Sequence, residues 1–171
     1  MKTNVGWVVL VGLCLTGALG ACSAGDDDDT PEGDKFELRL TGRDSAGYEQ
    51  VLLGVSRIEV MAQGKPLVFQ LGKEARAMEL TREDHAYLLG NFYLPKAAEE
   101  AEVIVHFDDV GAFKEAGSSG LINARSGAIL FKSKRVELEK RKHAVIELHL
   151  KDSLFQARSA RVLLPSTFIV H

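Results

Sequence analysis

The sequence is poor in cysteine and tryptophan. Its 171 residues include 2 cysteines, Cys14 and Cys22, and 1 tryptophan, Trp7. If the chain is cut before Cys22, one cysteine remains and an intrachain disulfide is excluded. Stability must then come from buried apolar side chains. The 150 of 171 residues that remain are enough for one domain with its own core.

A strong excess of positive charge is also missing. The formal net charge is −3, and an acidic segment (Asp26 to Asp29, Glu32 and Asp34) provides six of the 24 acidic residues. Residues 35–171 contain 20 of the 21 Lys and Arg residues, all except Lys2. They contain 18 of the 24 Asp and Glu residues. Nucleic-acid-binding domains usually have a strongly basic face, so this balance argues against a nucleic-acid partner.

Motifs of common catalytic and metal sites are absent. The sequence has no HExxH, CxxC or GxSxG motif and no adjacent glycines that could cradle a phosphate. Ser118-Ser119-Gly120 lies in a stretch predicted to be a loop. Adjacent acids such as Asp108-Asp109 would point to opposite faces of a strand. We therefore expect no enzymatic activity and no cofactor.

An apolar stretch begins near Val5 and ends in Leu19-Gly20-Ala21-Cys22. This stretch is too short to span a membrane as a stable helix, and Lys2 precedes it. Its end resembles the lipobox of bacterial lipoprotein signal peptides, which implies cleavage before Cys22 and lipid attachment there. Cys14 follows the bulky Leu13 and does not fit. An ordinary signal peptide cut after Ala21 and an uncleaved anchor are the alternatives.

Residues 22–34 are predicted to be an acidic, flexible tether. Gly25, Pro31 and Gly33 disfavour regular structure, and four adjacent aspartates repel one another. The segment is interpreted as a spacer or as a sorting signal, because acidic runs after the lipidated cysteine resemble surface-export signals. Ser23 is unlike an inner-membrane retention aspartate, which favours the outer membrane in a Gram-negative cell. Weak calcium binding would require a folded loop.

Alternating apolar and polar residues predict strands over most of residues 35–171. The pattern is clear at 36–41, 102–107 and 144–150. In residues 50–61 the apolar parity changes, which predicts a β-bulge near Ser56-Arg57. A capping-box pattern, Thr81 to Asp84, and Gly90 predict one short helix over 82–89. Residues 109–120 are predicted to be a loop, and 136–142 the first strand and the turn of a hairpin that continues into 144–150. The expected fold is mainly β, an antiparallel sandwich with one short helix.

Several stretches resemble a family of uncharacterised bacterial lipoprotein domains of unknown function. Leu38-Arg39-Leu40-Thr41 followed by Val51 to Val60 is similar to its opening, whose first strand ends in a Leu-Thr-Asp-Ala-Pro-like turn. Tyr93-Leu94-Pro95 resembles its middle. Ile146 to Ser153, followed by Val162 to Pro165, resembles the C-terminal part of the family. Gly42 to Ser45 replaces the usual turn. The resemblance implies an immunoglobulin-like or transthyretin-like sandwich and no activity.

Five histidines are candidate metal ligands: His85, His106, His143, His149 and His171. His106 and Asp108 would share a face if their strand continued, and His149 is on the polar side of another strand. Two ligands do not make a tight zinc site, so no bound metal is expected.

A cationic patch is predicted around residues 132–142. Its members are Lys132, Lys134, Arg135, Lys140, Arg141 and Lys142. It could contact anionic lipid headgroups or an acidic partner. Alternatively, it could be a solubilising hairpin that protects a sheet edge.

These features favour a lipid-anchored module of the cell envelope that binds a partner or has a structural role. The expected partner, besides the membrane, is another envelope protein or polymer. The alternative is a carbohydrate-binding or glycan-processing protein. Sugars usually stack on exposed aromatic rings, and Tyr48, Tyr87 and Tyr93 are the tyrosines available.

Overall fold

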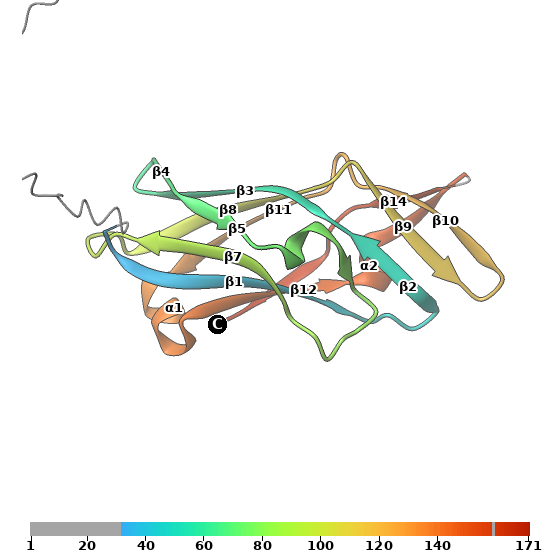
Figure 1. Cartoon of the computed structure of the whole chain (residues 1–171), viewed down its shortest axis with the longest axis horizontal. Helices are drawn as coiled ribbons and strands as arrows, with labels where there is room; N and C mark the ends of the chain where they lie inside the picture. Colours follow the sequence, from blue (N-terminus) through green and yellow to red (C-terminus); the bar gives the residue numbers. More distant parts are fainter. Residues whose placement is uncertain (1–31, 159) are drawn as a thin grey trace, which may run out of the picture. The chain divides into compact units, whose positions relative to one another are not determined.

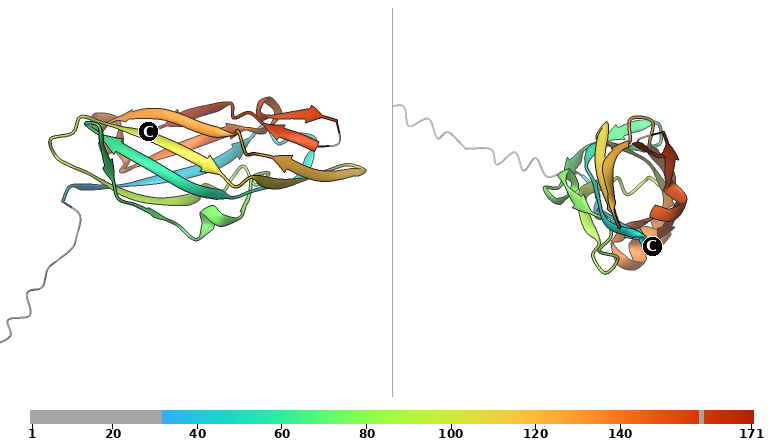
Figure 2. Two further views of the ribbon diagram at one scale, coloured as in Figure 1. Left: turned by 90° about the horizontal axis from the view of Figure 1, so that it is seen from above. Right: turned by 90° about the vertical axis from the view of Figure 1, so that its right-hand side faces the viewer.

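The computed structural model describes residues 32–158 and 160–171, which form a mainly β domain (Figure 1). The predicted signal peptide and most of the predicted tether lie outside these residues. Three sheets contain the strands, and sheets A and C enclose a common interior (Figure 2). The prediction of a mainly β fold is confirmed, and the arrangement is consistent with a β-sandwich. No helix in the described residues has the length and hydropathy of a membrane span.

Sheet A contains the first and last strands of the described residues. Its spatial order is β15 (Thr167–Val170), β12 (His143–His149), β1 (Asp34–Arg43), β7 (Tyr87–Leu94) and β5 (Phe69–Leu71). β1 pairs with β12 in parallel, with Glu37 opposite His143, and its other neighbour is antiparallel. Apolar and polar residues alternate along β1 and β12, and the apolar ones point inward: Leu38, Leu40 and Ile146 are fully buried.

Sheet C lies opposite sheet A. Its order is β11 (Ala128–Lys134), β8 (Glu100–Phe107), β3 (Val55–Ala62) and β4 (Lys65–Leu67). All its pairs are antiparallel. Val103 and Val105 of β8 point into the core, and Ile104 and His106 are partly exposed, as their alternation predicts. Pro66 lies in β4, an edge strand, where a missing N–H is tolerated.

Sheet B lies at the end of the domain opposite the first described residues (Figure 1). Its order is β13 (Leu154–Ala157), β14 (Ala160–Leu163), β10 (Ser118–Asn123), β9 (Val110–Glu115), β2 (Tyr48–Leu53) and β6 (Met78–Glu79). β10 and β14 are parallel, and the other pairs are antiparallel. β6 is a two-residue edge strand next to β2.

The chain crosses between sheets B and C at two adjacent points. β2 continues into β3 through Gly54, and β8 continues into β9 through Asp108-Asp109. A Cβ at Gly54 would lie 2.7 Å from the Arg76 carbonyl oxygen, so this close approach to backbone requires glycine. The pairing register between β3 and β8 shifts between Val55 and Arg57. The bulge predicted near Ser56-Arg57 is therefore confirmed at a point where the chain changes sheets.

The helix predicted over 82–89 is wrong. Residues 82–86 form a turn and a loop, and β7 begins at Tyr87. The Thr81 hydroxyl, the expected helix cap, donates to the Glu79 carboxylate at 2.7 Å, and the Glu83 carboxylate accepts hydrogen bonds from the N–H and hydroxyl of Ser45 (2.7 and 2.6 Å). The Tyr87 hydroxyl donates to the carbonyl of Glu79 at 2.8 Å. Contacts with distant segments thus determine the conformation of this stretch.

The loop predicted over 109–120 is also wrong, because β9 and β10 form a hairpin there. Ser118 pairs with Glu115 across a turn in which Gly117 has φ +77°. A glycine with positive φ is typical of two-residue hairpin turns. Phe113 and Ile122 are buried and hold the hairpin against the core.

The hairpin predicted at 136–142 is a helix, α1 (Arg135–Arg141). Leu138 is buried and Val136 is exposed, so the two residues do not share a face as strand alternation requires. Lys142 ends the helix in the left-handed conformation, with φ 61°, and its N–H donates to the Leu138 carbonyl at 2.7 Å. Two shorter helical segments are α2 (Leu150–Ser153) and the 3₁₀ turn η1 (Glu74–Arg76).

Candidate functional site

The predicted lipidation site lies outside the described residues. This holds for Cys22 and for the signal positions Leu19, Gly20 and Ala21. The description begins at Glu32, and Asp34 is the first residue of β1. Asp34 lies beside α1, because its carboxylate accepts a hydrogen bond from Arg135 at 2.6 Å. Any tether therefore joins the domain at the end that carries α1.

The six residues of the predicted cationic patch have different roles. Lys132 and Lys134 lie on β11, and the others lie on α1 or just after it. The Lys132 ammonium is 3.3 Å from Glu100 and 3.5 Å from Glu102, both on β8. The hydrogen bond to Glu100 raises the pKa of Lys132. Its charge is thus compensated across the sheet.

Arg135 points inward. Its side chain is 16% exposed and its guanidinium donates to Asp34, to Glu139 and to three carbonyls. These carbonyls belong to Leu94 at the end of β7 and to Pro95 and Ala98 in the loop that follows it. Because all these partners come from the domain itself, Arg135 stabilises the fold and is removed from the predicted patch.

Three cations remain exposed at the C-terminal end of α1, and we call Lys140, Arg141 and Lys142 the α1 cation cluster. Within the described residues none of them has an acidic ion-pair partner. The Lys142 ammonium lies 5.3 Å from the centre of the Phe36 ring in β1. Cations at a helix C-terminus are stabilised by the helix dipole.

A cavity of about 370 Å³ lies beside α1. It is lined by Glu99, Glu100, Lys134, Arg135, Val136 and Glu139. Its three carboxylates outnumber its two cations, so it does not suit an anionic ligand.

His106 and Asp108 do not form a metal site. The His106 ring is 3.1 Å from Glu59 and 3.5 Å from Arg57, whereas Asp108 lies beyond the end of β8 against Gly54. The described residues contain no cluster of three His, Cys, Asp or Glu side chains arranged to hold an ion.

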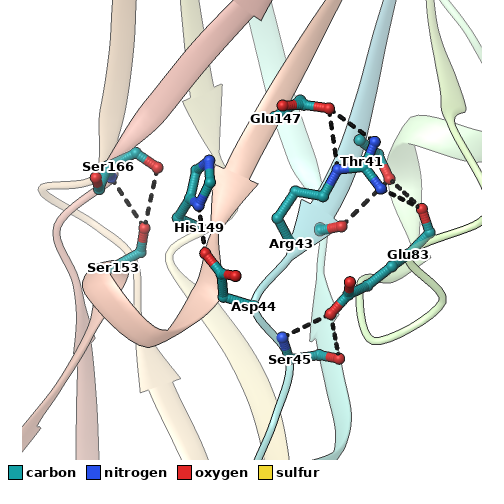
Figure 3. A network of polar contacts seen from close by, with 10 residues as sticks. Thr41, Arg43, Asp44, Ser45, Glu83, Glu147, His149, Ser153 and Ser166 are labelled. Atoms are coloured by element: carbon teal, nitrogen blue, oxygen red, sulfur yellow. Dashed lines mark hydrogen bonds and ion pairs between the residues drawn. The ribbon is translucent and has the colours of Figure 1, made fainter.

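A polar network joins β1, β12 and the loop before β7 (Figure 3). The Arg43 guanidinium donates to Glu147 Oε1 at 2.7 and 3.0 Å and to the carbonyl of Glu83 at 2.8 Å. Hydrogen bonds from the Ser45 side chain and backbone lower the pKa of Glu83. Each charge faces a partner inside the network, so the arrangement holds elements together and leaves no charge for a ligand.

His149 forms a second part of this network (Figure 3). Its Nδ1 contacts the Asp44 carboxylate. Its ring packs edge-on against the Phe168 ring, with 5.0 Å between the ring centroids. The buried Ser153 hydroxyl nearby accepts a hydrogen bond from the N–H of Ser166 at 2.9 Å. Sequence analysis named His149 but missed Asp44, which precedes it by 105 residues.

The outer face of sheet B carries an apolar patch beside polar residues of the same parity such as Lys114 and Asn123, and this patch was not predicted from the sequence. Its members are Leu52, Val110, Ala112, Leu121, Phe155 and Val162. Val110, Leu121 and Phe155 are 58%, 60% and 49% exposed. They alternate with inward residues such as Phe113 and Ile122. Alternation would have shown the face if residues 109–120 had been recognised as strands.

A groove of about 310 Å³ runs over this face. Its lining includes Val110, Leu121, Asn123, Arg125 and Ala160. Arg125 forms an exposed ion pair with Asp109 at 3.0 Å beside it. Exposed apolar surface with a polar rim is typical of protein interaction sites.

Comparison of the chain with protein families, curated proteins and solved structures finds no match.

Proposed function

We propose that the protein is a lipid-anchored, non-catalytic binding module of the cell envelope that contacts its partner through the outer face of sheet B. The observation that carries the proposal is the exposure of Val110, Leu121 and Phe155 on one face of one sheet. A soluble domain gains nothing from exposing three large apolar side chains together, whereas a partner could bury them.

The position of this face supports the same function. Asp34, where the chain enters the domain, lies with α1 at one end, and sheet B lies at the other (Figure 1). A lipid at Cys22 would attach the domain through the chain that enters it at Asp34. Sheet B lies at the other end of the domain, so this attachment would leave it open to another envelope protein.

Lipid attachment is tested by labelling cells with a fatty acid. We expect Cys22→Ser to abolish labelling and leave an unprocessed precursor, because the acyl chain needs this thiol. Cys14→Ser is the matched control and should label normally. Normal labelling of Cys22→Ser would refute the anchor.

The binding face is tested with a photo-crosslinking residue at position 121 in intact cells. We expect a discrete adduct with one envelope protein, and we expect Phe155→Asp to remove it without unfolding the domain. Position 130 is the control, since Leu130 is 64% exposed but lies on sheet C. The same adducts from both positions, or none from 121, would contradict the proposal.

Carbohydrate binding has weaker support. Tyr87 is buried and bonded to Glu79, and the Arg161 guanidinium lies 5.9 Å from the Tyr48 ring. Retention on a glycan array that persists in the Leu121→Asp variant would favour this alternative.

A further inference from the structure

β11 is the longest edge strand in the part of the chain that the structure describes. It has seven residues, and in that part it pairs with β8 alone. The other sheet edges are β15, β5, β13, β6 and β4, each of four residues or fewer, and β4 contains Pro66. Short strands and proline protect an edge from pairing with another chain. β11 has neither form of protection.

Lysine side chains also protect edges by repelling a second strand, but those of β11 are matched by acids of the same sheet. In the register with β8, Lys132 lies opposite Glu102 and Lys134 lies opposite Glu100. The Lys132 ammonium is 3.3 Å from Glu100 and 3.5 Å from Glu102. This edge therefore carries little net charge that would repel a second copy.

The centre of β11 exposes apolar surface on both sides of the strand. Ile129, Phe131 and Ser133 share the inward parity, and Ile129 and Ser133 are buried. Phe131 packs against the core but is only partly buried. On the outward parity Leu130 is 64% exposed. A further strand beside β11 would cover both side chains.

We propose that β11 pairs in antiparallel orientation with β11 of a second copy of this chain, about a two-fold axis at Phe131. Two-fold symmetry is the commonest symmetry of protein dimers. The axis places Phe131 opposite its own equivalent, and aromatic cross-strand pairs stabilise sheets. The contact joins two copies of sheet C into one continuous sheet and leaves the outer face of sheet B free, so it does not depend on the proposed function.

The side chains of β11 are complementary to themselves in this register. Lys132 lies opposite Leu130 of the second copy, and Lys134 lies opposite Ala128 of the second copy, so no lysines face each other. The methylene groups of Lys132 can cover the exposed Leu130 side chain. On the inward side Ser133 meets Ile129. This complementarity favours a second copy over an unrelated strand.

Sedimentation equilibrium of the purified full chain measures the association. The pairing is shorter than a standard protein interface, so we expect a weak dimer with a dissociation constant of roughly micromolar order. Leu130→Lys places like charges opposite each other on both sides of the axis and should weaken the dimer about tenfold. Leu130→Glu places a carboxylate opposite Lys132 and should change the dissociation constant by less than about threefold. A monomer at every concentration, or equal weakening by both variants, would overturn the proposal.

Leu121→Lys is the matched control, because Leu121 is 60% exposed and lies on sheet B. It should leave the dimer unchanged. Hydrogen exchange locates the contact independently: amides of β11 should exchange several-fold more slowly at high protein concentration, and those of β13, an edge of sheet B, should not change. Loss of the dimer in Leu121→Lys, or protection of β13 in place of β11, would assign self-association to sheet B and overturn the proposal.

Discussion

Arg135 connects the N-terminus of α1 to two other parts of the domain. Its guanidinium donates to Asp34 of β1 and to three carbonyls at the end of β7 and in the loop between β7 and β8. The residue is mostly buried, so removal of its charge leaves these acceptors without a donor. Unpaired buried acceptors cost more than the net value of the bonds they lose.

We expect Arg135→Gln to lower the free energy of unfolding by about 2–3 kcal/mol. Arg141→Gln is the matched control on the exposed side of the same helix and should change it by less than about 0.5 kcal/mol. Urea unfolding measures both. Equal effects would mean that the Arg135 contacts carry no particular stability.

Sequence could name the cations but not separate their roles. Arg135 and Arg141 are alike in a list of six positive residues. What distinguishes them is the loop at Leu94 to Ala98, which covers the first turn of α1 and leaves the last turn exposed. That loop is close only in the folded chain.

At the scale of elements, Gly90 shows how a local signal can mislead. A helix stop was predicted there, but Gly90 lies inside β7 with φ +151°. An added Cβ would be 2.0 Å from the Gln70 carbonyl and 2.6 Å from the Phe69 ring of β5. Glycine is needed because two strands approach closely, not because a helix ends.

Gly90→Ala should destabilise the domain by about 2–5 kcal/mol, since backbone strain and a steric clash add together. Gly64→Ala is the control, because Gly64 also has positive φ (+74°) but an added Cβ there meets nothing within 4 Å. It should cost about 1–2 kcal/mol. Thermal unfolding of both variants checks the difference, and equal losses would refute the clash.

Strands that alternate over six or more residues, such as β8 and β12, were predictable from their own residues. Local sequence patterns did not exclude a helix at 82–89. The Glu83 carboxylate is hydrogen-bonded to Ser45, 38 residues earlier, and such a contact is not visible in the local sequence. Residues 109–120 are rich in glycine and serine, and only Phe113 and Ile122 mark the strands by burial. Long-range pairing decided these elements.

At the scale of the molecule, the C-terminal residue connects two sheets. His171 follows β15 of sheet A, and its Nε2 is 2.8 Å from the Ser133 hydroxyl on β11 of sheet C. Burial lowers the pKa of His171; Glu137 raises it and Lys140 lowers it further. The folded domain therefore favours the neutral imidazole.

This histidine should make stability depend on pH. Above its unfolded pKa of about 6.5 its contribution is fully present, and it is lost as pH falls from there through the lower folded pKa, because the unfolded chain binds the proton more readily. We expect His171→Gln to flatten this loss in urea unfolding between pH 7 and 5. His143→Gln should keep it. An unchanged pH profile in His171→Gln would refute this role.

The central position of β1 also matters for tension. β1 runs from the α1 end of the domain to sheet B, with β7 and β12 bonded along its two edges (Figure 1). If lipid holds one end and a partner pulls at the other, the load passes along this strand. Its ladder bonds lie across the pulling direction, so they must yield together rather than one by one. Such an arrangement resists mechanical extraction of the N-terminal strand.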